Sequence, residues 1–152
     1  MKNQMELEFD AISENESFAR VSVAAFLAGL DPTIEEMSDV KTAVSEAVTN
    51  AVIHAYPREK YDGGRIRIEA RIEENQFFIC VEDEGIGIEN VKRAMEPLYT
   101  TKTDEERSGM GFSFMEAFMD KIEVESTLGI GTRIHMKKKI GQESYANCTI
   151  LV

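Results

Sequence analysis

Alternating apolar and polar residues predict the strands of this chain. Met5–Phe9 alternates with acidic residues, which is typical of a strand with one buried face. Arg65–Ile72 repeats the same period of two, and an apolar run, Gln76–Glu82, begins after three intervening residues. These two ranges therefore predict an antiparallel hairpin. Shorter patterns predict two more strands, at residues 122–124 and over Thr132–Lys138, for a total of about five.

Apolar residues spaced three and four apart predict three long helices. The first covers about Glu14–Ala28, with Ser13 and Glu16 as its capping box. The third is opened by Gly109–Gly111 and is rich in Phe and Met. A shorter helical stretch is expected near Val91–Met95. The residues of the first helix that are expected to face the core include Phe18, Val21 and Ala25.

The second and longest helix is predicted over Thr33–Ala55. Thr33 and Glu36 form a capping box at its start, and Pro57 disfavours helical geometry just beyond its end. The residues that recur at helical spacing predict one buried stripe, made of Met37, Val40, Val44, Ala47, Val48, Ala51 and Val52.

A polar stripe runs beside the apolar stripe of this helix. Glu46, Asn50 and His54 follow one another at steps of four residues and so share one side of the helix. Taken alone, such a stripe is either a solvated edge or the wall of a site. The order of strands and helices lacks a regular βαβ alternation, which predicts an α+β two-layer sandwich. We expect a single domain over residues 1–138 and a C-terminal tail over 139–152.

Composition narrows the class of protein. A chain of 152 residues with 43% apolar residues can bury the core of one domain. It contains neither the roughly 20 consecutive apolar residues of a membrane span nor the apolar core of a signal peptide. Cys80 and Cys148 lack metal-ligand spacing, so we expect reduced thiols and a cytoplasmic protein. The formal net charge of −11 disfavours nucleic acid and acidic membranes as partners and suits a basic protein.

Three glycine-containing stretches suggest a nucleotide site. Asp83-x-Gly85-x-Gly87 places a carboxylate at a strand end, where it can accept a hydrogen bond from an exocyclic amine such as that of adenine. Gly109-x-Gly111 opens a helix, whose free N–H groups suit phosphates. A third stretch, Thr127 to Thr132, reads T-x-G-x-G-T. Each motif alone is weak, and a plain turn explains the first equally well.

The order of these motifs resembles the nucleotide-binding boxes of the GHKL superfamily, which includes gyrases, heat-shock chaperones and histidine kinases. The resemblance implies a mixed sheet covered on one face by helices, with ATP held between the helices and a mobile lid at about residues 88–108. The chain also resembles the bacterial anti-sigma serine kinases, most closely the sporulation anti-sigma-F factors. Ser13–Phe26, Val44–Tyr56 and Pro97–Asp120 carry that similarity.

This resemblance implies a role for each candidate residue. Glu46 takes the position of the catalytic carboxylate, and Asn50 offers the carbonyl oxygen that Mg²⁺ prefers. Arg107, as a second catalytic residue, would neutralise charge during transfer. Asp83 would bind adenine with support from Thr132. Arg20 is the candidate contact with a partner protein; the alternative interpretation is a solvated surface cation. The remaining candidate nucleotide contacts are Gly85, Gly87, Thr100, Thr101, Lys102, Ser108, Gly109, Met110, Gly111 and Phe112.

The implied function is that of an anti-sigma factor which sequesters a sporulation sigma factor. With ATP and Mg²⁺ it would phosphorylate a serine of an anti-anti-sigma protein and release ADP, and the family implies a homodimer. Two alternatives stay open: an anti-sigma kinase of another pathway, such as general stress, and a nucleotide-dependent binding module without kinase activity. A histidine-kinase catalytic domain is a weaker interpretation, since neither His54 nor His135 lies in an acceptor-like helix.

Overall fold

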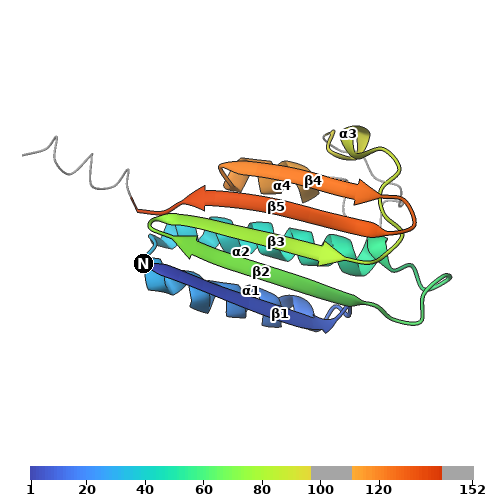
Figure 1. The fold of residues 1–152 in the computed structure, drawn as a ribbon, viewed down its shortest axis with the longest axis horizontal. Coiled ribbons are helices and arrows are strands. Elements are labelled where there is room, and N and C mark those ends of the chain that lie inside the picture. The colour runs from blue at the N-terminus through green and yellow to red at the C-terminus, as the bar shows by residue number, and fades with distance from the viewer. Residues whose placement is uncertain (97–110, 142–152) are drawn as a thin grey trace, which may run out of the picture.

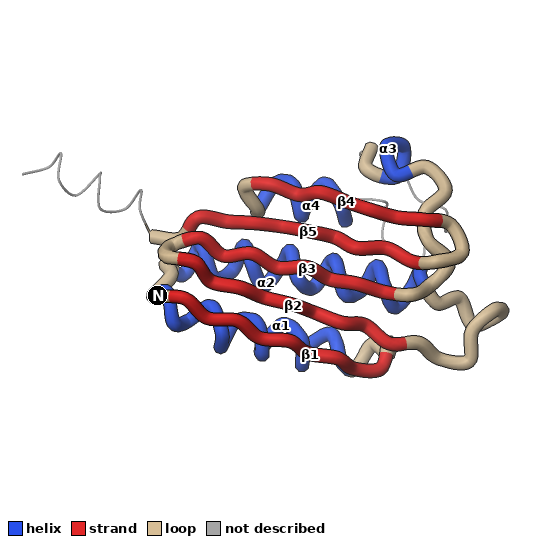
Figure 2. Tube along the Cα trace, in the orientation of Figure 1, coloured by secondary structure: helices blue, strands red, loops and turns tan. Residues whose placement is uncertain are grey.

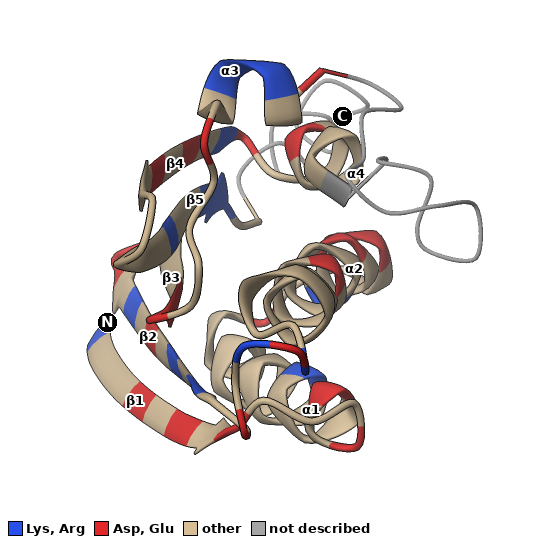
Figure 3. Ribbon diagram, turned by 90° about the vertical axis from the view of Figure 1, so that its right-hand side faces the viewer, with Lys and Arg blue, Asp and Glu red and all other residues tan. Residues whose placement is uncertain are grey.

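The computed structural model describes residues 1–96 and 111–141, which form one sheet with helices on one of its faces (Figures 1 and 2). Seen from the side, α1, α2 and α4 form the second layer and α3 lies at the end of the sheet (Figure 3). The elements in chain order are β1 (Lys2–Asp10), α1 (Asn15–Leu27), a 3-10 turn (Ala28–Leu30), α2 (Ile34–Asn50), a π-helical turn (Ala51–Ala55), β2 (Arg65–Glu73), β3 (Gln76–Asp83), α3 (Val91–Ala94), α4 (Gly111–Phe118), β4 (Lys121–Thr127) and β5 (Gly131–Lys139). The predicted α+β two-layer sandwich is confirmed.

The sheet is antiparallel at every pairing among the described residues, with the strand order β1-β2-β3-β5-β4. The expectation of a mixed sheet is therefore wrong. Strands β3 and β4 run in the same direction, but β5 lies between them and pairs antiparallel with both. The hairpin of β4 and β5 packs against β3 through β5. If β4 paired directly with β3, that pair would be parallel, but β5 separates the two strands.

The core lies between the sheet and the helices. On β2, Ile66, Ile68, Ala70 and Ile72 all point inward and are at most 1% exposed, as the period of two predicts. The opposite face of the sheet carries ion pairs between neighbouring strands. Arg67, for example, pairs with Glu6, Glu69 and Glu82. Because these side chains are largely exposed, such pairs contribute little to stability.

Helix α1 buries a different side from the one expected. Its buried residues are Ala19, Val23 and Leu27, whereas Phe18 and Val21 are 50% and 60% exposed and Ala25 is also exposed. The expected capping box is absent as well, because the helix begins after Glu14 without a side-chain cap. The Glu16 side chain instead accepts a hydrogen bond from Ser45 and pairs with Arg20 at 3.2 Å. The Glu16 carboxylate, which the capping box would have used, is thus engaged by Ser45 of α2 and by Arg20 of α1.

Helix α2 begins as predicted, with Thr33 as its N-cap and both hydrogen bonds of the Thr33–Glu36 capping box present. Its buried stripe holds most of the expected residues, although Met37 and Val52 are only half-buried. At Ala51 the helix widens into the π-helical turn. Such turns insert one residue into the helical register and are frequent at functional sites.

The packed part of the chain extends beyond the expected boundary at Lys138. Strand β5 includes Lys139, and Ile140 is 3% exposed. The N–H of Gly141 donates to Oε2 of Glu36 at 2.9 Å. The C-terminal end of the described chain is therefore fastened to the first turn of α2. No helix in the two described ranges is long and apolar enough to cross a membrane.

Candidate functional site

Asp83 ends β3 as a buried carboxylate, 9% exposed. Its Oδ1 accepts a 2.9 Å hydrogen bond from the N–H of Gly85. Burial raises the pKa of Asp83 to about 6, while main-chain hydrogen bonds from Gly85 and Thr132 counteract that rise. A buried carboxylate that still has acceptor capacity is suited to bind an amine of a ligand.

The loop after Asp83 packs directly against the end of α2. A Cβ at Gly85 would lie 2.1 Å from the carbonyl oxygen of Ala55, in the π-helical turn. The same oxygen accepts a 2.9 Å hydrogen bond from the N–H of Ile86. Only glycine allows this approach, so the first glycine of the motif joins the loop to the helix that carries Glu46 and Asn50.

The T-x-G-x-G-T stretch lies against the same loop from the other side. Gly131 has φ +143°, and a Cβ there would lie 2.1 Å from the carbonyl oxygen of Asp83. Thr132 pairs with Asp83 across β3 and β5 and is 7% exposed. The sequence analysis includes Gly131 in the T-x-G-x-G-T stretch but not among the candidate nucleotide contacts.

Two further contacts hold the loop that contains Gly87. A Cβ at Gly87 would lie 2.3 Å from the carbonyl oxygen of Thr127, and the N–H of Gly129 donates to the carbonyl oxygen of Ile86 at 2.7 Å. The Oγ of Ser126 accepts from the N–H of Ile88 at 2.7 Å. It also lies 2.8 Å from Oγ1 of Thr132. Ser126 thus joins the loop to the threonine beside Asp83, and no sequence motif singled it out.

Tyr56 fastens the start of the loop. Its hydroxyl accepts from the N–H of Glu84 and donates to the carbonyl oxygen of Arg65, both at 2.7 Å. The side chain is 8% exposed, and burial raises its pKa. No sequence motif singled out Tyr56 either, because an aromatic residue after a helix is common and its two partners are main-chain groups.

Glu46 and Asn50 lie one turn apart on α2, as the spacing predicted. Glu46 is 7% exposed and Asn50 is half-buried at the last residue of the α-helical part. The next turn is π-helical, so His54 no longer continues their stripe at regular α-helical spacing. Asn50 is the last residue of α2, and the π-helical turn that follows it ends at Ala55, against which the Asp83 loop packs.

Comparison with known proteins shows the family of this chain. The family model of the histidine kinase-like ATPase domain matches residues 9–138. The chain belongs to this family. It also belongs to the group of anti-sigma F factors within it, since it is 63% identical to the anti-sigma F factor of Clostridium acetobutylicum over 91% of this chain and 95% of that protein. It is 57% identical to the one from Pasteuria penetrans over 91% and 92%.

Two solved structures share the fold. The RsbU and RsbW domains of Rv1364c from Mycobacterium tuberculosis superpose with a TM-score of 0.64 at 18% identity. That match covers 91% of this chain and 32% of the other. The catalytic domain of the histidine kinase ThkA gives a TM-score of 0.55 at 19% identity, over 90% of this chain and 96% of that one.

The residues present fit the ATP that an ATPase domain binds. The buried acceptor on Asp83 meets the need of an adenine amine, and the contact of Gly85 with Ala55 holds the loop that follows this acceptor. In the described ranges, no group of three or more His, Cys, Asp or Glu side chains could hold a metal ion. Mg²⁺ takes few protein ligands, because phosphate oxygens and water complete its octahedron.

Several predicted nucleotide contacts and the predicted catalytic Arg107 fall outside the described residues. They are Thr100, Thr101, Lys102, Arg107, Ser108, Gly109 and Met110. Gly111 is the first residue of α4, and Phe112, which follows it, is half-buried. Helix α4 packs against α2, so its first turn lies on the same layer as Glu46 and Asn50 (Figure 3).

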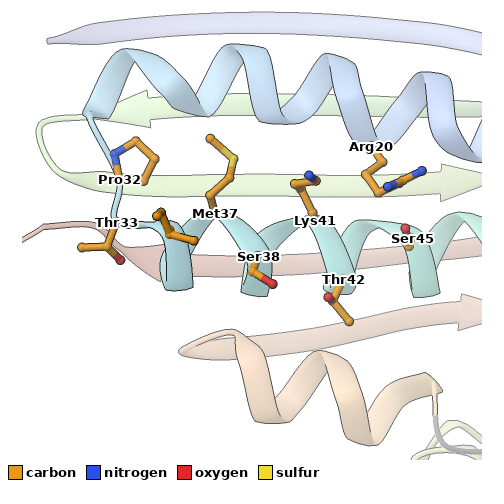
Figure 4. A pocket seen from close by; sticks show the side chains of 9 residues that line it. Arg20, Pro32, Thr33, Met37, Ser38, Lys41, Thr42 and Ser45 are labelled. Carbon is orange, nitrogen blue, oxygen red and sulfur yellow. The ribbon is translucent and has the colours of Figure 1, made fainter.

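The predicted partner residue Arg20 lies away from this site. It lines a groove of about 600 Å³ between α1 and α2, together with Pro32, Ile34, Met37, Lys41 and Ser45 (Figure 4). Successive residues of an α-helix point about 100° apart, so Ser45 can face this groove while Glu46 faces the neighbouring side of α2. Neither Glu46 nor Asp83 lines this groove.

Proposed function

We propose that this chain is an anti-sigma factor that sequesters a sporulation sigma factor and phosphorylates a serine of its anti-anti-sigma protein with ATP. The identity of 63% to a curated anti-sigma F factor, over nine-tenths of both chains, carries the proposal. The buried Glu46, one turn before Asn50, supports the kinase activity, because a module that only binds nucleotide needs no carboxylate there.

The site divides into a base-binding end and a transfer end. Asp83 accepts a hydrogen bond from the adenine amine, and Thr132 supports it from β5. Gly85 and Gly87 place the loop beside the base and sugar through their close contacts with Ala55 and Thr127. Asn50 would hold Mg²⁺ through its carbonyl oxygen, and the bound ion would neutralise phosphate charge. Gly109, Met110 and Gly111 offer N–H groups to the phosphates, with Thr100, Thr101, Lys102, Ser108 and Phe112 as further contacts.

Glu46 acts at the transfer end as the general base. The acceptor serine oxygen forms a bond to the γ-phosphorus, the bond from that phosphorus to the bridging oxygen of ADP breaks, and the serine proton passes to a carboxylate oxygen of Glu46. Arg107 neutralises the charge that develops on the transferred group. A base in this role typically contributes about 10²–10⁴-fold to the rate.

The partners follow from the same proposal. The net charge of −11 suits a basic sigma factor, and Arg20 at the α1–α2 groove is the candidate contact. The protein acts in the cytoplasm as a homodimer. The exposed Phe18 and Val21 on α1 provide apolar surface that a second protomer can cover.

The test is incubation of the protein with Mg-ATP and the anti-anti-sigma protein, followed by mass measurement of that protein. The proposal predicts a gain of one phosphate on a serine. A partner of unchanged mass that still binds in the presence of nucleotide would instead support a binding module without kinase activity. Capture of a stress sigma factor rather than the sporulation one, from a mixture of purified sigma factors, would assign the protein to another pathway.

A further inference from the structure

Three polar side chains on neighbouring strands form a row on the helix-covered face of the sheet. Asp83 on β3 is directly opposite Thr132 on β5, and Thr132 is directly opposite Ser126 on β4 (Figure 1). Asp83 and Thr132 are 9% and 7% exposed, and Ser126 is half-buried. Directly opposite side chains have Cβ atoms about 4.5–5.5 Å apart. The row therefore connects the buried carboxylate to a serine that has no role in the proposed function.

The Ser126 hydroxyl makes three contacts with a single proton. Its Oγ accepts from the N–H of Ile88 at 2.7 Å, and it lies 3.1 Å from the carbonyl oxygen of Gly131 and 2.8 Å from Oγ1 of Thr132. A serine hydroxyl offers one donor and two acceptor lone pairs. Because an amide N–H only donates and a carbonyl oxygen only accepts, Ile88 takes one lone pair of Ser126 and Gly131 takes its proton.

Thr132 then supplies the proton of the third contact. With the Ser126 proton on the carbonyl oxygen of Gly131, only the Thr132 hydroxyl can donate between the two hydroxyl oxygens. In the reverse arrangement Ser126 would donate to Thr132, and the carbonyl oxygen of Gly131 would lose this donor. The arrangement that satisfies all three contacts therefore directs the Thr132 proton to Ser126. It leaves Thr132 Oγ1 with lone pairs alone for a ligand.

Two neighbouring acceptors favour one kind of purine. The carboxylate of Asp83 retains acceptor capacity beyond its hydrogen bonds from the N–H groups of Gly85 and Thr132. Adenine carries an amine with two N–H donors at position 6, whereas guanine and hypoxanthine carry an oxygen there, which only accepts. Two oxygens that accept from one amine at about 2.9 Å each lie about 5 Å apart, which matches the spacing of directly opposite side chains. A 6-oxo group would meet two acceptors instead.

We propose that Ser126 is a positioning residue that holds Thr132 as an acceptor beside Asp83 and thereby strengthens the preference of the site for a 6-amino purine over a 6-oxo purine. The inference rests on the proposed binding of adenine at Asp83 and Thr132. Without Ser126, the Thr132 hydroxyl is free to turn and donate to a 6-oxo group. The preference then falls, and the part that is due to Asp83 remains.

The affinities for Mg-ATP and Mg-ITP test this, because ITP carries a 6-oxo group in place of the amine. Titration calorimetry at pH 8 keeps Asp83 ionised, since its pKa is about 6. The ratio of the ITP to the ATP dissociation constant should fall by about threefold to tenfold in Ser126→Ala, the effect of one hydrogen bond. Ser126→Thr should restore the wild-type ratio. Thr127→Ala, the matched control, removes an exposed hydroxyl from the opposite face of β4 and should leave the ratio unchanged.

A double substitution shows whether Ser126 acts through Thr132. In a Thr132→Val background, Ser126→Ala should not change the ratio further. In the nucleotide-free protein, urea unfolding should show that the losses of stability from these two substitutions are coupled rather than additive. Equal weakening of ATP and ITP binding by Ser126→Ala would overturn the proposal, since a merely structural role gives that result. A further change of the ratio in the Thr132→Val background would overturn it as well.

These measurements separate the inference from the proposed function, because they require neither phosphate transfer nor a partner protein. A protein that shows the predicted ratios but does not phosphorylate the anti-anti-sigma protein would support the inference and contradict the kinase activity. Equal affinity of the wild type for ATP and ITP would overturn the inference together with the adenine role of Asp83. That result would leave the test of serine phosphorylation unaffected.

Discussion

The main chain of Gly85 lies so close to the carbonyl group of Ala55 that a methyl group at position 85 would sit 2.1 Å from that oxygen. This contact joins the loop after Asp83 to the helix that carries Glu46 and Asn50. The two halves of the proposed site are therefore placed by a contact between backbones, and a small change at this contact should disturb both binding and stability.

Gly85→Ala should weaken ATP binding and destabilise the fold. The added methyl group forces the loop away from Ala55, and overpacking of this kind typically costs about 1–3 kcal/mol. ATP affinity should fall by about tenfold or more, since about 1.4 kcal/mol of lost interaction has that effect. Titration calorimetry and urea unfolding measure both. Gly29→Ala is the matched control, because a Cβ there meets only the Met1 side chain, at 3.5 Å. Equal effects of the two substitutions would contradict this role of Gly85.

Asp83 should make stability depend on pH. Its folded-state pKa of about 6 lies above the ordinary 3.8, so the folded protein binds the proton more tightly than the unfolded chain does. The contribution of this group therefore favours folding below about pH 4 and is lost as pH rises from about 4 to 6. The loss amounts to about 3 kcal/mol, at about 1.4 kcal/mol per pKa unit. Asp83→Asn should remove this dependence and weaken ATP binding at every pH. Its one side-chain oxygen is needed by the N–H of Gly85, and its amide nitrogen cannot accept a hydrogen bond from the adenine amine.

Urea unfolding at a series of pH values from 4 to 8 measures this difference between the two proteins. Glu84→Gln, a change at the exposed neighbouring carboxylate, should leave the pH dependence intact. An Asp83→Asn protein with the wild-type pH profile would show that another group causes it.

Tyr56→Phe should lower the free energy of unfolding by about 1–3 kcal/mol. The substitution removes the hydroxyl that now bonds both the N–H of Glu84 and the carbonyl oxygen of Arg65, and each such hydrogen bond typically contributes about 0.5–1.5 kcal/mol. Tyr61→Phe is a matched control, since Tyr61 contacts the Tyr56 ring edge-on at 5.3 Å. Unfolding of the two variants in urea should separate them, and an unchanged Tyr56→Phe protein would show that the hydroxyl does not fasten the loop.

Arg20→Ala should weaken sigma-factor binding by about fivefold or more, since an arginine anchor of an interface typically contributes more than about 1 kcal/mol. Surface-plasmon measurements at several salt concentrations should show wild-type binding that weakens as salt rises, because charge complementarity is screened. Lys60→Ala removes an exposed cation from the loop after α2 and serves as the control. Salt-independent wild-type affinity would argue against an electrostatic interface.

Much of this architecture was predictable, because the strands and α2 each carry a single strong period. The inward residues of β2 and the Thr33–Glu36 capping box are confirmed. Helix α1 was not predictable to the same degree. It is apolar on more than one side, so its pattern alone could not tell Val23, which is 1% exposed, from Val21, which is 60% exposed.

The motifs of the site were predictable from the sequence, but the contacts that hold these motifs together were not. The order of Glu46, Asn50, Asp83 and the glycines is visible in the sequence. The contacts that bring them together are made by main-chain atoms of Ala55 and by the hydroxyl of Ser126, which no motif marks. The antiparallel sheet was missed for a similar reason, since strand order depends on where a hairpin is inserted and local patterns do not encode it.

The central claim is that Asn50 serves Mg-ATP binding whereas Glu46 serves phosphate transfer. Asn50→Ala should abolish binding of Mg-ATP, because the one protein oxygen assigned to the ion is lost. Glu46→Gln should retain it, because the amide preserves the shape of the side chain but cannot take the serine proton. Titration of both variants with Mg-ATP verifies that they differ in binding before transfer is measured.

The most direct test is the transfer of labelled γ-phosphate to the anti-anti-sigma protein by Glu46→Gln under saturating Mg-ATP. The account predicts a rate about 10²–10⁴-fold below that of the wild type, with nucleotide bound normally. Transfer at the wild-type rate would contradict the assignment of Glu46 as the base, and with it the mechanism proposed for this site.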